Sequence, residues 1–271
     1  MARPPMRNLI FKASIAAILF PLLLLPAGAH SQQGKNEKKK QQLTAEQIAE
    51  LVILAHGGLG GRNTLQFVKK NGVERGTIRL AGDRGETVGN ITIQFMRKEK
   101  SWLDHKRIDV ELPNRTLTLG FDGVSVWGAL NGKSIVPRPE DEKLFRARLI
   151  HTYDSLLRYK EDESKLEYIG SEKIVGIDTE VLDLIHNDGS KTRYYISGRT
   201  FRILHLEYDL ALSSIDPPVK FRESFLDFRT FHNILIPGKI TTIQDGKFVQ
   251  EVKITSATYS GKMDERIFQS Y

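Results

Sequence analysis

Residues 44–57 combine a polar start with apolar side chains at helical spacing. Thr44 and Gln47 have the spacing of a capping box, in which the hydroxyl of Thr44 accepts the backbone N–H of Gln47 and the side chain of Gln47 accepts that of Thr44. The apolar positions that follow on one face are Ile48, Leu51, Val52 and Ala55. Gly57 ends the pattern, and a short second helix is expected around 63–69. Because an isolated amphipathic helix is marginal in water, this one must pack on an apolar surface.

From Val73 onwards the hydrophobic period changes to two, which indicates β-strands. Turn sequences such as Asp122-Gly123 and Asn187-Asp188-Gly189 separate the runs at hairpin distances. One further helical stretch, 141–159, interrupts the strands. Connections this short exclude crossover helices, so the pattern predicts about eleven antiparallel strands. Strand twist curls a sheet of that size. We therefore expect an α+β, mainly β fold: a curved antiparallel half-barrel covered by two or three helices.

The first 31 residues follow the order of a secretory signal peptide. Three basic residues precede an uncharged run at 15–25; they are Arg3, Arg7 and Lys12. As a helix the run would span only about 16 Å, half the hydrocarbon core of a bilayer, which favours export over a membrane anchor. The small-x-small rule fits cleavage after Ala29 or after Ser31. We therefore expect a periplasmic protein.

The excess of positive charge lies ahead of the expected domain. Of the formal net charge of +7, three charges fall in the signal segment and three in the lysine-rich stretch before residue 41. Residues 32–43 are expected to form a basic, flexible lead, and 44–271 a single domain that is nearly neutral. Such a domain lacks the basic surface that binds nucleic acid. The absence of cysteine excludes disulfides, thiolate metal sites and a cysteine nucleophile.

Candidate catalytic and metal-binding groups form no familiar pattern. The chain has no Gly-x-Ser-x-Gly elbow and no His-Glu-x-x-His helix, and its 7 histidines lack metal-ligand spacing. Asp109 and Glu111 would lie about 6.6 Å apart on one strand face, a separation that suits an inverting glycosidase. They alternate with Ile108 and Val110, however, which is typical of a solvent-facing side. The sequence therefore predicts a protein that is not an enzyme and holds no metal or cofactor.

What remains is a set of large apolar side chains with only short helices to cover them. If the helices leave the concave side of the sheet open, these side chains line a cavity suited to acyl chains. The predicted ligand-binding residues are Ile91, Ile93, Phe95, Trp102, Leu119, Phe121 and Trp127 on the sheet and its connections, with Leu51 and Leu149 on the helices. A packed core would use the same residues, and the pattern leaves both readings open.

The order of these parts resembles the LolA/LolB-like superfamily, and more closely the outer-membrane lipoprotein-sorting proteins. The resemblance rests on Gly57-Gly58 after the first helix, on Phe-Asp-Gly-Val-Ser-Val-Trp at 121–127, and on a terminal strand pair around 240–259. It implies a half-barrel over an apolar cavity that shelters acyl chains. The protein would then be a monomeric periplasmic carrier of lipoprotein or lipid cargo, working with donor and acceptor proteins at membranes.

Two other functions stay open at this point. Regulatory relatives of the superfamily imply an envelope sensor or scaffold that binds a partner protein through the same fold. A small or filled cavity together with an exposed apolar patch would favour that function. An envelope hydrolase is the third hypothesis, and it would need a catalytic role for Asp109 or Glu111.

Overall fold

The computed structural model describes residues 42–82 and 85–270, and residues from 42 onwards form one compact unit. The predicted signal peptide and most of the basic lead lie outside the described residues. The chain enters α1 (Ala45–Gly57) through the predicted capping box, with Thr44 and Gln47 each bonded to the other's backbone N–H. A single 3-10 turn, η1 (Gly58–Gly60), leads into α2 (Gly61–Val68), the predicted second helix.

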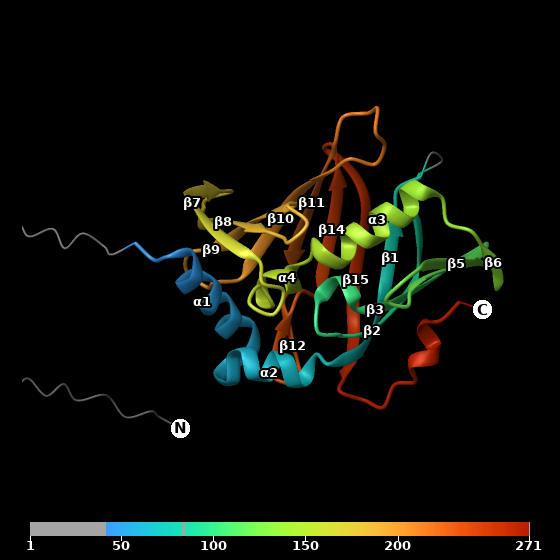
Figure 1. Cartoon of the computed structure of the whole chain (residues 1–271), viewed down its shortest axis with the longest axis horizontal. Coiled ribbons are helices and arrows are strands. Elements are labelled where there is room, and N and C mark those ends of the chain that lie inside the picture. Colours follow the sequence, from blue (N-terminus) through green and yellow to red (C-terminus); the bar gives the residue numbers. More distant parts are fainter. Residues whose placement is uncertain (1–41, 83–84, 271) are drawn as a thin grey trace, which may run out of the picture. The chain divides into compact units, whose positions relative to one another are not determined.

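Thirteen strands form one open antiparallel sheet (Figure 1). They are β1 (Asn71–Leu80), β2 (Thr87–Met96), β3 (His105–Leu112), β4 (Arg115–Phe121), β5 (Val126–Leu130), β6 (Lys133–Ile135), β7 (Lys165–Ile174), β8 (Ile177–Ile185), β9 (Lys191–Ser197), β10 (Ile203–Leu210), β11 (Val219–Leu226), β14 (Lys239–Gln244) and β15 (Lys247–Tyr259). Their spatial order is β6-β5-β4-β3-β2-β1-β15-β14-β11-β10-β9-β8-β7. The chain thus runs outwards from β1 to the edge strand β6, resumes at the opposite edge with β7, and runs inwards until β15 pairs with β1.

The predicted fold class is confirmed, but the predicted number of strands is too low. In addition to the thirteen strands of the main sheet, β12 (Arg229–Phe231) and β13 (Ile234–Ile236) form a separate two-stranded hairpin. These two strands and β6 have three residues each. A run of three residues is too short for a period of two to be recognised, which accounts for most of the difference.

The predicted helix at 141–159 is two helices. These are α3 (Pro139–Ile150), which crosses one face of the sheet in Figure 1, and α4 (Tyr153–Leu157). The break falls at Thr152, whose hydroxyl accepts the backbone N–H of Ser155 at the start of α4. Threonine is favoured as such a cap and disfavoured inside a helix, which explains the break. None of the helices in the described part of the chain is long and apolar enough to span a membrane.

Strand register gives the sheet one apolar and one polar face. Ile93 on β2 pairs with Ile108 on β3, and Ile108 pairs with Leu119 on β4, so the three side chains share one face. We call it the concave face, because the helices α1, α3 and α4 cover it. Asp109 alternates with these residues and lies on the outer face, where it accepts hydrogen bonds from Arg107 and Thr118.

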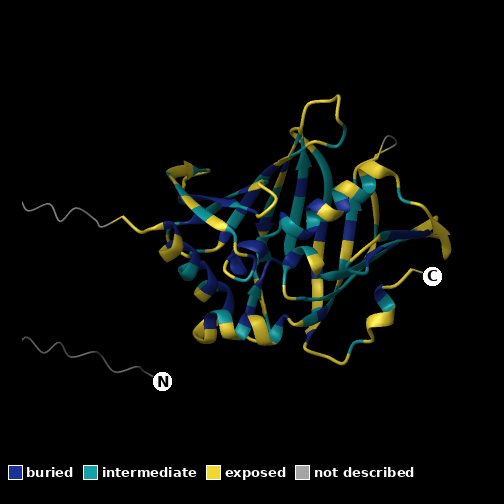
Figure 2. Ribbon diagram, viewed as in Figure 1, coloured by how far each residue is buried: buried dark blue, intermediate teal, exposed yellow. Residues whose placement is uncertain are grey.

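The main core lies between α1 and the strands from β3 across to β8. Ile48 and Val52 of α1 are fully buried there, together with Leu156 of α4. Figure 2 shows buried residues, in dark blue, along α1 and in the strands of the sheet. A second, smaller core joins Phe145 and Leu149 of α3 to Phe121 on β4. The two cores hold α1 and α3 over different parts of the same face.

Candidate functional site

Half-buried apolar side chains lie on the concave face at the borders of the two cores. Ile93, Ile108 and Leu119 form one cross-strand row over β2, β3 and β4, and all three side chains are half-buried. We call these three residues the apolar row. The next position on the same face of β2, Ile91, is 4% exposed, and Phe121, two positions beyond Leu119 on β4, is 1% exposed. An accessible apolar row therefore lies between two closed parts of the face.

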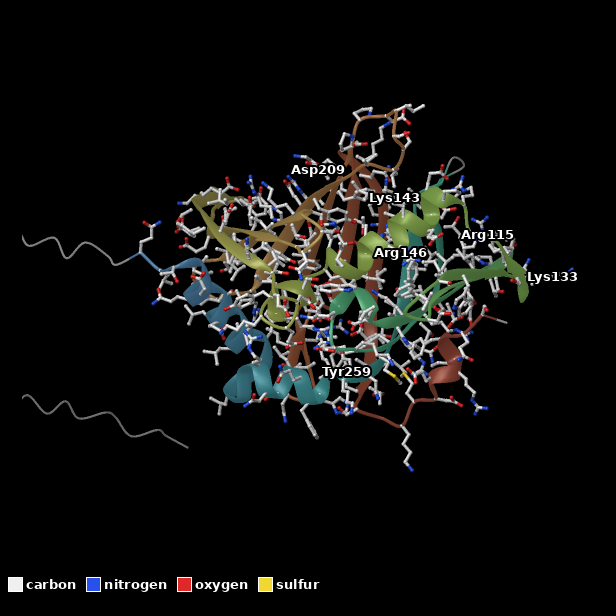
Figure 3. All side chains as sticks on the ribbon, in the orientation of Figure 1. Arg115, Lys133, Lys143, Arg146, Asp209 and Tyr259 are labelled. Carbon is white, nitrogen blue, oxygen red and sulfur yellow. The ribbon has the colours of Figure 1, made fainter. Side chains whose placement is uncertain are left out.

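A groove of about 620 Å³ runs along the flank of α3. Its other wall is formed by the turn between β8 and β9 and by the end of β10. Trp102, from the 3-10 turn η2 (Ser101–Leu103), and Leu149, Ile150 and Leu210 supply apolar surface. The polar lining residues are Lys143, Arg146, His151, His186, Asn187, Asp188, Ser190 and Asp209. Figure 3 labels Lys143 and Arg146 on α3 and Asp209 near them. The volume is within the range of pockets that bind small molecules.

The structure separates the predicted ligand-binding residues into several places. Ile93 and Leu119 belong to the apolar row, and Trp102 and Leu149 line the groove. Leu51 lies on the far side of α1, in a shallow pocket of about 450 Å³ that also contains Leu43, Leu54 and Tyr159. Their roles in ligand binding stay predictions.

Three other predicted residues are placed against neighbouring side chains. Ile91 belongs to the main core, and Phe121 packs against Phe145 in the smaller core. Phe95 is half-buried on the concave face, and its ring centroid lies 6.2 Å from that of Tyr259. Phe95 therefore borders the open part of the face, whereas Ile91 and Phe121 are enclosed.

Trp127 is on the outer face, not on the concave face where the sequence analysis placed it. It pairs with Gly120 on β4, and Gly120 pairs with Arg107, so Trp127 follows the polar alternation. Its indole Nε1 donates a 2.6 Å hydrogen bond to the carbonyl of Phe268, in the C-terminal 3-10 turn η3 (Glu265–Phe268). Val126, not Trp127, is opposite Phe121 across the hairpin. Adjacent strand residues point to opposite faces, which is why both aromatic residues cannot line one wall.

Three polar side chains that the sequence analysis did not single out point to the same face as the apolar residues of their strands, and a fourth comes from α3. Lys106 on β3 lies between Phe95 and Phe121 by register, and Glu223 on β11 shares its face with Phe221 and Phe225. Arg148 comes from α3 and Tyr208 from β10. The sequence could have indicated two of them, because Lys106 and Glu223 stand at alternating positions of their strands that are otherwise apolar. We call Lys106, Arg148, Tyr208 and Glu223 the polar cluster.

The polar cluster is electrostatically coupled. Burial raises the pKa of Glu223, and the positive charges of Arg148 and Lys106 act against this effect. Burial lowers the pKa of Lys106, while Glu223 raises it. In the described part of the chain, none of these three side chains forms an ion pair. Arg148 Nε and the hydroxyl of Tyr208 are buried without a hydrogen-bond partner.

Two buried histidines lie where the groove meets the core. His151 Nδ1 and His186 Nε2 are each 2.7 Å from the hydroxyl of Thr192. The ring of His151 also stacks on that of Tyr208, with centroids 4.3 Å apart. Burial lowers the pKa of His151 to about 3, with a smaller contribution from His186, so both rings are neutral near pH 7. The described residues contain no cluster of three or more histidine or carboxylate groups that would hold a metal.

Comparison with known proteins identifies the fold. No protein-family model and no curated protein matches the chain. A LolA superfamily protein from Nitrosomonas europaea matches over 84% of this chain and 99% of its own, with a TM-score of 0.54 and 15% identity. A DUF1329 family protein from Desulfovibrio piger matches over 84% and 98%, with a TM-score of 0.56 and 12% identity.

A third solved structure is described as an outer membrane lipoprotein-sorting protein domain, from Vibrio parahaemolyticus. It matches 83% of this chain and 95% of its own, with a TM-score of 0.52 and 11% identity. At these identities the likeness establishes the fold alone. The chain has a LolA-like fold, as the order of its sequence elements predicts.

Proposed function

We propose that this protein is a non-enzymatic periplasmic carrier that binds the acyl chains of a lipoprotein or a lipid against the concave face of its sheet. The observation that carries this proposal is the apolar row of Ile93, Ile108 and Leu119, whose side chains are only half-buried. A soluble protein gains nothing from apolar side chains that stay in contact with water. An acyl chain laid along the row removes that contact.

The energetics suit a carrier that must also release its cargo. Each methylene transferred from water to an apolar surface contributes about 0.8 kcal/mol. A chain that buries several methylenes therefore binds with several kcal/mol, without any catalytic group or metal. The groove along α3 meets the smaller core at Leu149, which lines the groove and also packs in that core. The likeness to the Vibrio lipoprotein-sorting domain supports lipoprotein as the cargo class.

The test is native mass spectrometry of the protein purified from its own envelope, followed by binding of a fluorescent acyl probe. We expect a co-purifying acyl species. The variant Ile93→Glu should abolish retention, because it puts a charge into the apolar row. Gln94→Glu is the matched control, since Gln94 is the next residue of β2 and faces Arg107 on the outer side. Folded protein that carries no acyl species and binds no acyl probe would overturn the proposal.

A second candidate function is a scaffold that binds a partner protein, and one observation favours it. Leu54 of α1, Leu59 of η1 and Phe67 of α2 are 50%, 107% and 78% exposed. Exposed apolar side chains on neighbouring elements are typical of interaction surfaces. A photo-crosslinker at residue 67, used in the intact envelope, separates the two functions. One defined crosslinked protein, together with no acyl species in the purified sample, would favour the scaffold.

A further inference from the structure

The two buried histidines at the inner wall of the groove share one hydroxyl group. His151 Nδ1 and His186 Nε2 each lie 2.7 Å from Oγ1 of Thr192. Contacts this short between nitrogen and oxygen are hydrogen bonds, so each of them contains a proton. His151 directly follows α3, whereas His186 and Thr192 lie on either side of the turn between β8 and β9. The shared hydroxyl therefore joins the end of α3 to this hairpin.

The second nitrogen of each ring is open to the groove. His151 and His186 both line the groove, although they are only 2% and 7% exposed. Within the described residues, no hydrogen bond engages His151 Nε2 or His186 Nδ1, and neither atom is closed off from solvent. These two outer nitrogens are therefore the polar atoms that the buried pair offers to a molecule in the groove.

The number of protons restricts what the two outer nitrogens can offer. Burial lowers the pKa of both histidines, although Asp188 and Asp162 raise that of His186, so each neutral ring carries one proton near pH 7. Thr192 has a single hydroxyl proton, which fills only one of the two contacts. At least one histidine must therefore donate its own proton to Thr192, and the outer nitrogen of that ring is a bare acceptor. Two outer N–H groups are excluded.

The charged residues of the groove lie at its rim. Two cations and two carboxylates line the groove, and all four are exposed: Lys143, Arg146, Asp188 and Asp209. Figure 3 labels three of them, Lys143, Arg146 and Asp209. The inner wall differs from the rim, because the two histidines are buried and neutral. Since burying an ion there would remove its hydration, the inner wall favours an uncharged group.

We propose that the groove binds an amphiphile through an uncharged polar group that donates a hydrogen bond to the His151–His186 pair, either a hydroxyl or an amide N–H. The apolar part of the ligand then lies against Trp102, Leu149 and Leu210. A hydroxyl or an amide also has an acceptor oxygen, which can meet an outer N–H of the pair. A carboxylate only accepts hydrogen bonds and leaves the bare nitrogen unpaired. The groove site goes beyond the proposed carrier function, because none of the described residues that line it belongs to the apolar row.

The test compares amphiphiles that share one short alkyl chain and differ in the hydrogen-bond donor. One pair is a primary amide and its N,N-dimethylamide, and the other is an alcohol and its methyl ether; a carboxylate is the fifth probe. Each is titrated calorimetrically below its micellar concentration. We expect the donor-bearing member of at least one pair to bind about tenfold more tightly than its partner, and the carboxylate to bind no better than the ether. The pair with the larger ratio separates amide from hydroxyl ligands.

Variants show whether the shared hydroxyl causes this donor preference. In His151→Phe or His186→Phe the remaining histidine can take either tautomer, so the preference should fall below about twofold. Phenylalanine keeps an aromatic ring in place, including the one that stacks on Tyr208. Thr192→Val should act in the same way, because it removes the contact that fixes the tautomers. His205→Phe is the matched control, since it replaces a buried histidine that stacks on Tyr195 away from the groove, and it should keep the preference.

Thermal unfolding verifies that each variant is folded, and His186→Gln replaces a phenylalanine variant that does not fold. Equal binding of both members of each pair, or no binding of any probe, would overturn the groove site. A donor preference that persists in the folded His151 and His186 variants would also overturn it. Ile93→Glu alters only the apolar row and should keep the preference. Its loss in folded Ile93→Glu would place the probes on the apolar row, which would support the carrier function and contradict the groove site.

Discussion

Lys69 Nζ donates a 2.6 Å hydrogen bond to Oδ2 of Asp154, although the side chain of Lys69 is only 2% exposed. Lys69 follows α2, and Asp154 lies in α4. Arg97, just after β2, forms a second ion pair with Asp154 at 3.1 Å, and the hydroxyl of Tyr153 lies 2.6 Å from Lys69 Nζ. One carboxylate thus joins α2, α4 and the end of β2. These contacts hold α2 and α4 against the end of β2, the strand that carries Ile93 of the apolar row.

We expect Asp154→Asn to destabilise the protein by about 3–5 kcal/mol, because it leaves two buried cations without their counter-charge. Urea unfolding at neutral pH measures the loss. Asp141→Asn is the matched control. Asp141 also pairs with an arginine, Arg138, but the two side chains are 42% and 76% exposed. Such a pair contributes about 1 kcal/mol or less. Equal losses in the two variants would show that the buried network does not have this structural role.

Stability should fall steadily as the pH drops from about 6.5 toward 4. Burial lowers the pKa of His56 and of His205 to about 4, and that of His151 to about 3. In the unfolded chain these groups bind protons below about pH 6.5, whereas in the folded protein they remain neutral. The unfolded state therefore binds more protons, and acid favours it. Each histidine should contribute about 1.4 kcal/mol per pH unit over that interval.

The measurement is the free energy of unfolding in urea at several pH values between 7.5 and 4.5. His205→Gln should lower the slope by about one proton, since it removes one of the three groups. His205 suits this purpose because it stacks on Tyr195 at the outer face and is remote from the groove. A slope that stays the same in this variant would contradict the assignment of the acid sensitivity to buried histidines.

The sequence predicts the local structure of this protein well, because local structure depends on neighbouring residues. The capping box of Thr44 and Gln47 and the placing of Asp109 on the outer face follow from spacing alone. The position of α3 over the sheet depends on contacts between residues remote in sequence, such as Phe145 and Phe121. Spacing cannot reveal those contacts, so the boundary between the filled and the accessible parts of the concave face is visible only in the structure.

The polar cluster was missed for a related reason. A charged residue at an apolar position of a strand, such as Lys106 or Glu223, usually lies at a strand end or an edge. β3 and β11 are far apart in the strand order, so spacing along the chain gives no sign that Lys106 and Arg148 both act on the charge of Glu223. Trp127 shows the opposite error. It is large and aromatic and lies near Phe121 in the sequence. Its strand pairing with Gly120, however, turns its side chain to the face opposite that of Phe121.

Trp127 and Phe268 form a contact that should matter for stability and not for cargo. Phe268 is fully buried against the outer face, and its carbonyl accepts the indole hydrogen bond. We expect Phe268→Ala to destabilise the fold by about 3–5 kcal/mol through the loss of packing. The fluorescence of Trp127, measured in a Trp102→Phe background, should shift to the red. Acyl binding by the folded fraction should be unchanged, and a parallel loss of acyl binding would place cargo on the outer face.

Ile108 and Ile91 offer a direct test of whether the concave face is open. Both point to this face, but Ile91 is 4% exposed in the main core, whereas Ile108 is half-buried in the apolar row. A larger side chain in a filled core costs about 1–3 kcal/mol, because the neighbouring residues must move. We therefore expect Ile91→Phe to lower stability by this amount and Ile108→Phe to change it by less than about 0.5 kcal/mol.

Ile108→Phe should nevertheless weaken acyl binding, since the new ring occupies the space of the chain. Thermal unfolding and acyl-probe titration of the two variants measure both effects. A similar loss of stability in both variants would mean that the apolar row is part of a closed core, and the carrier function would lose its main support.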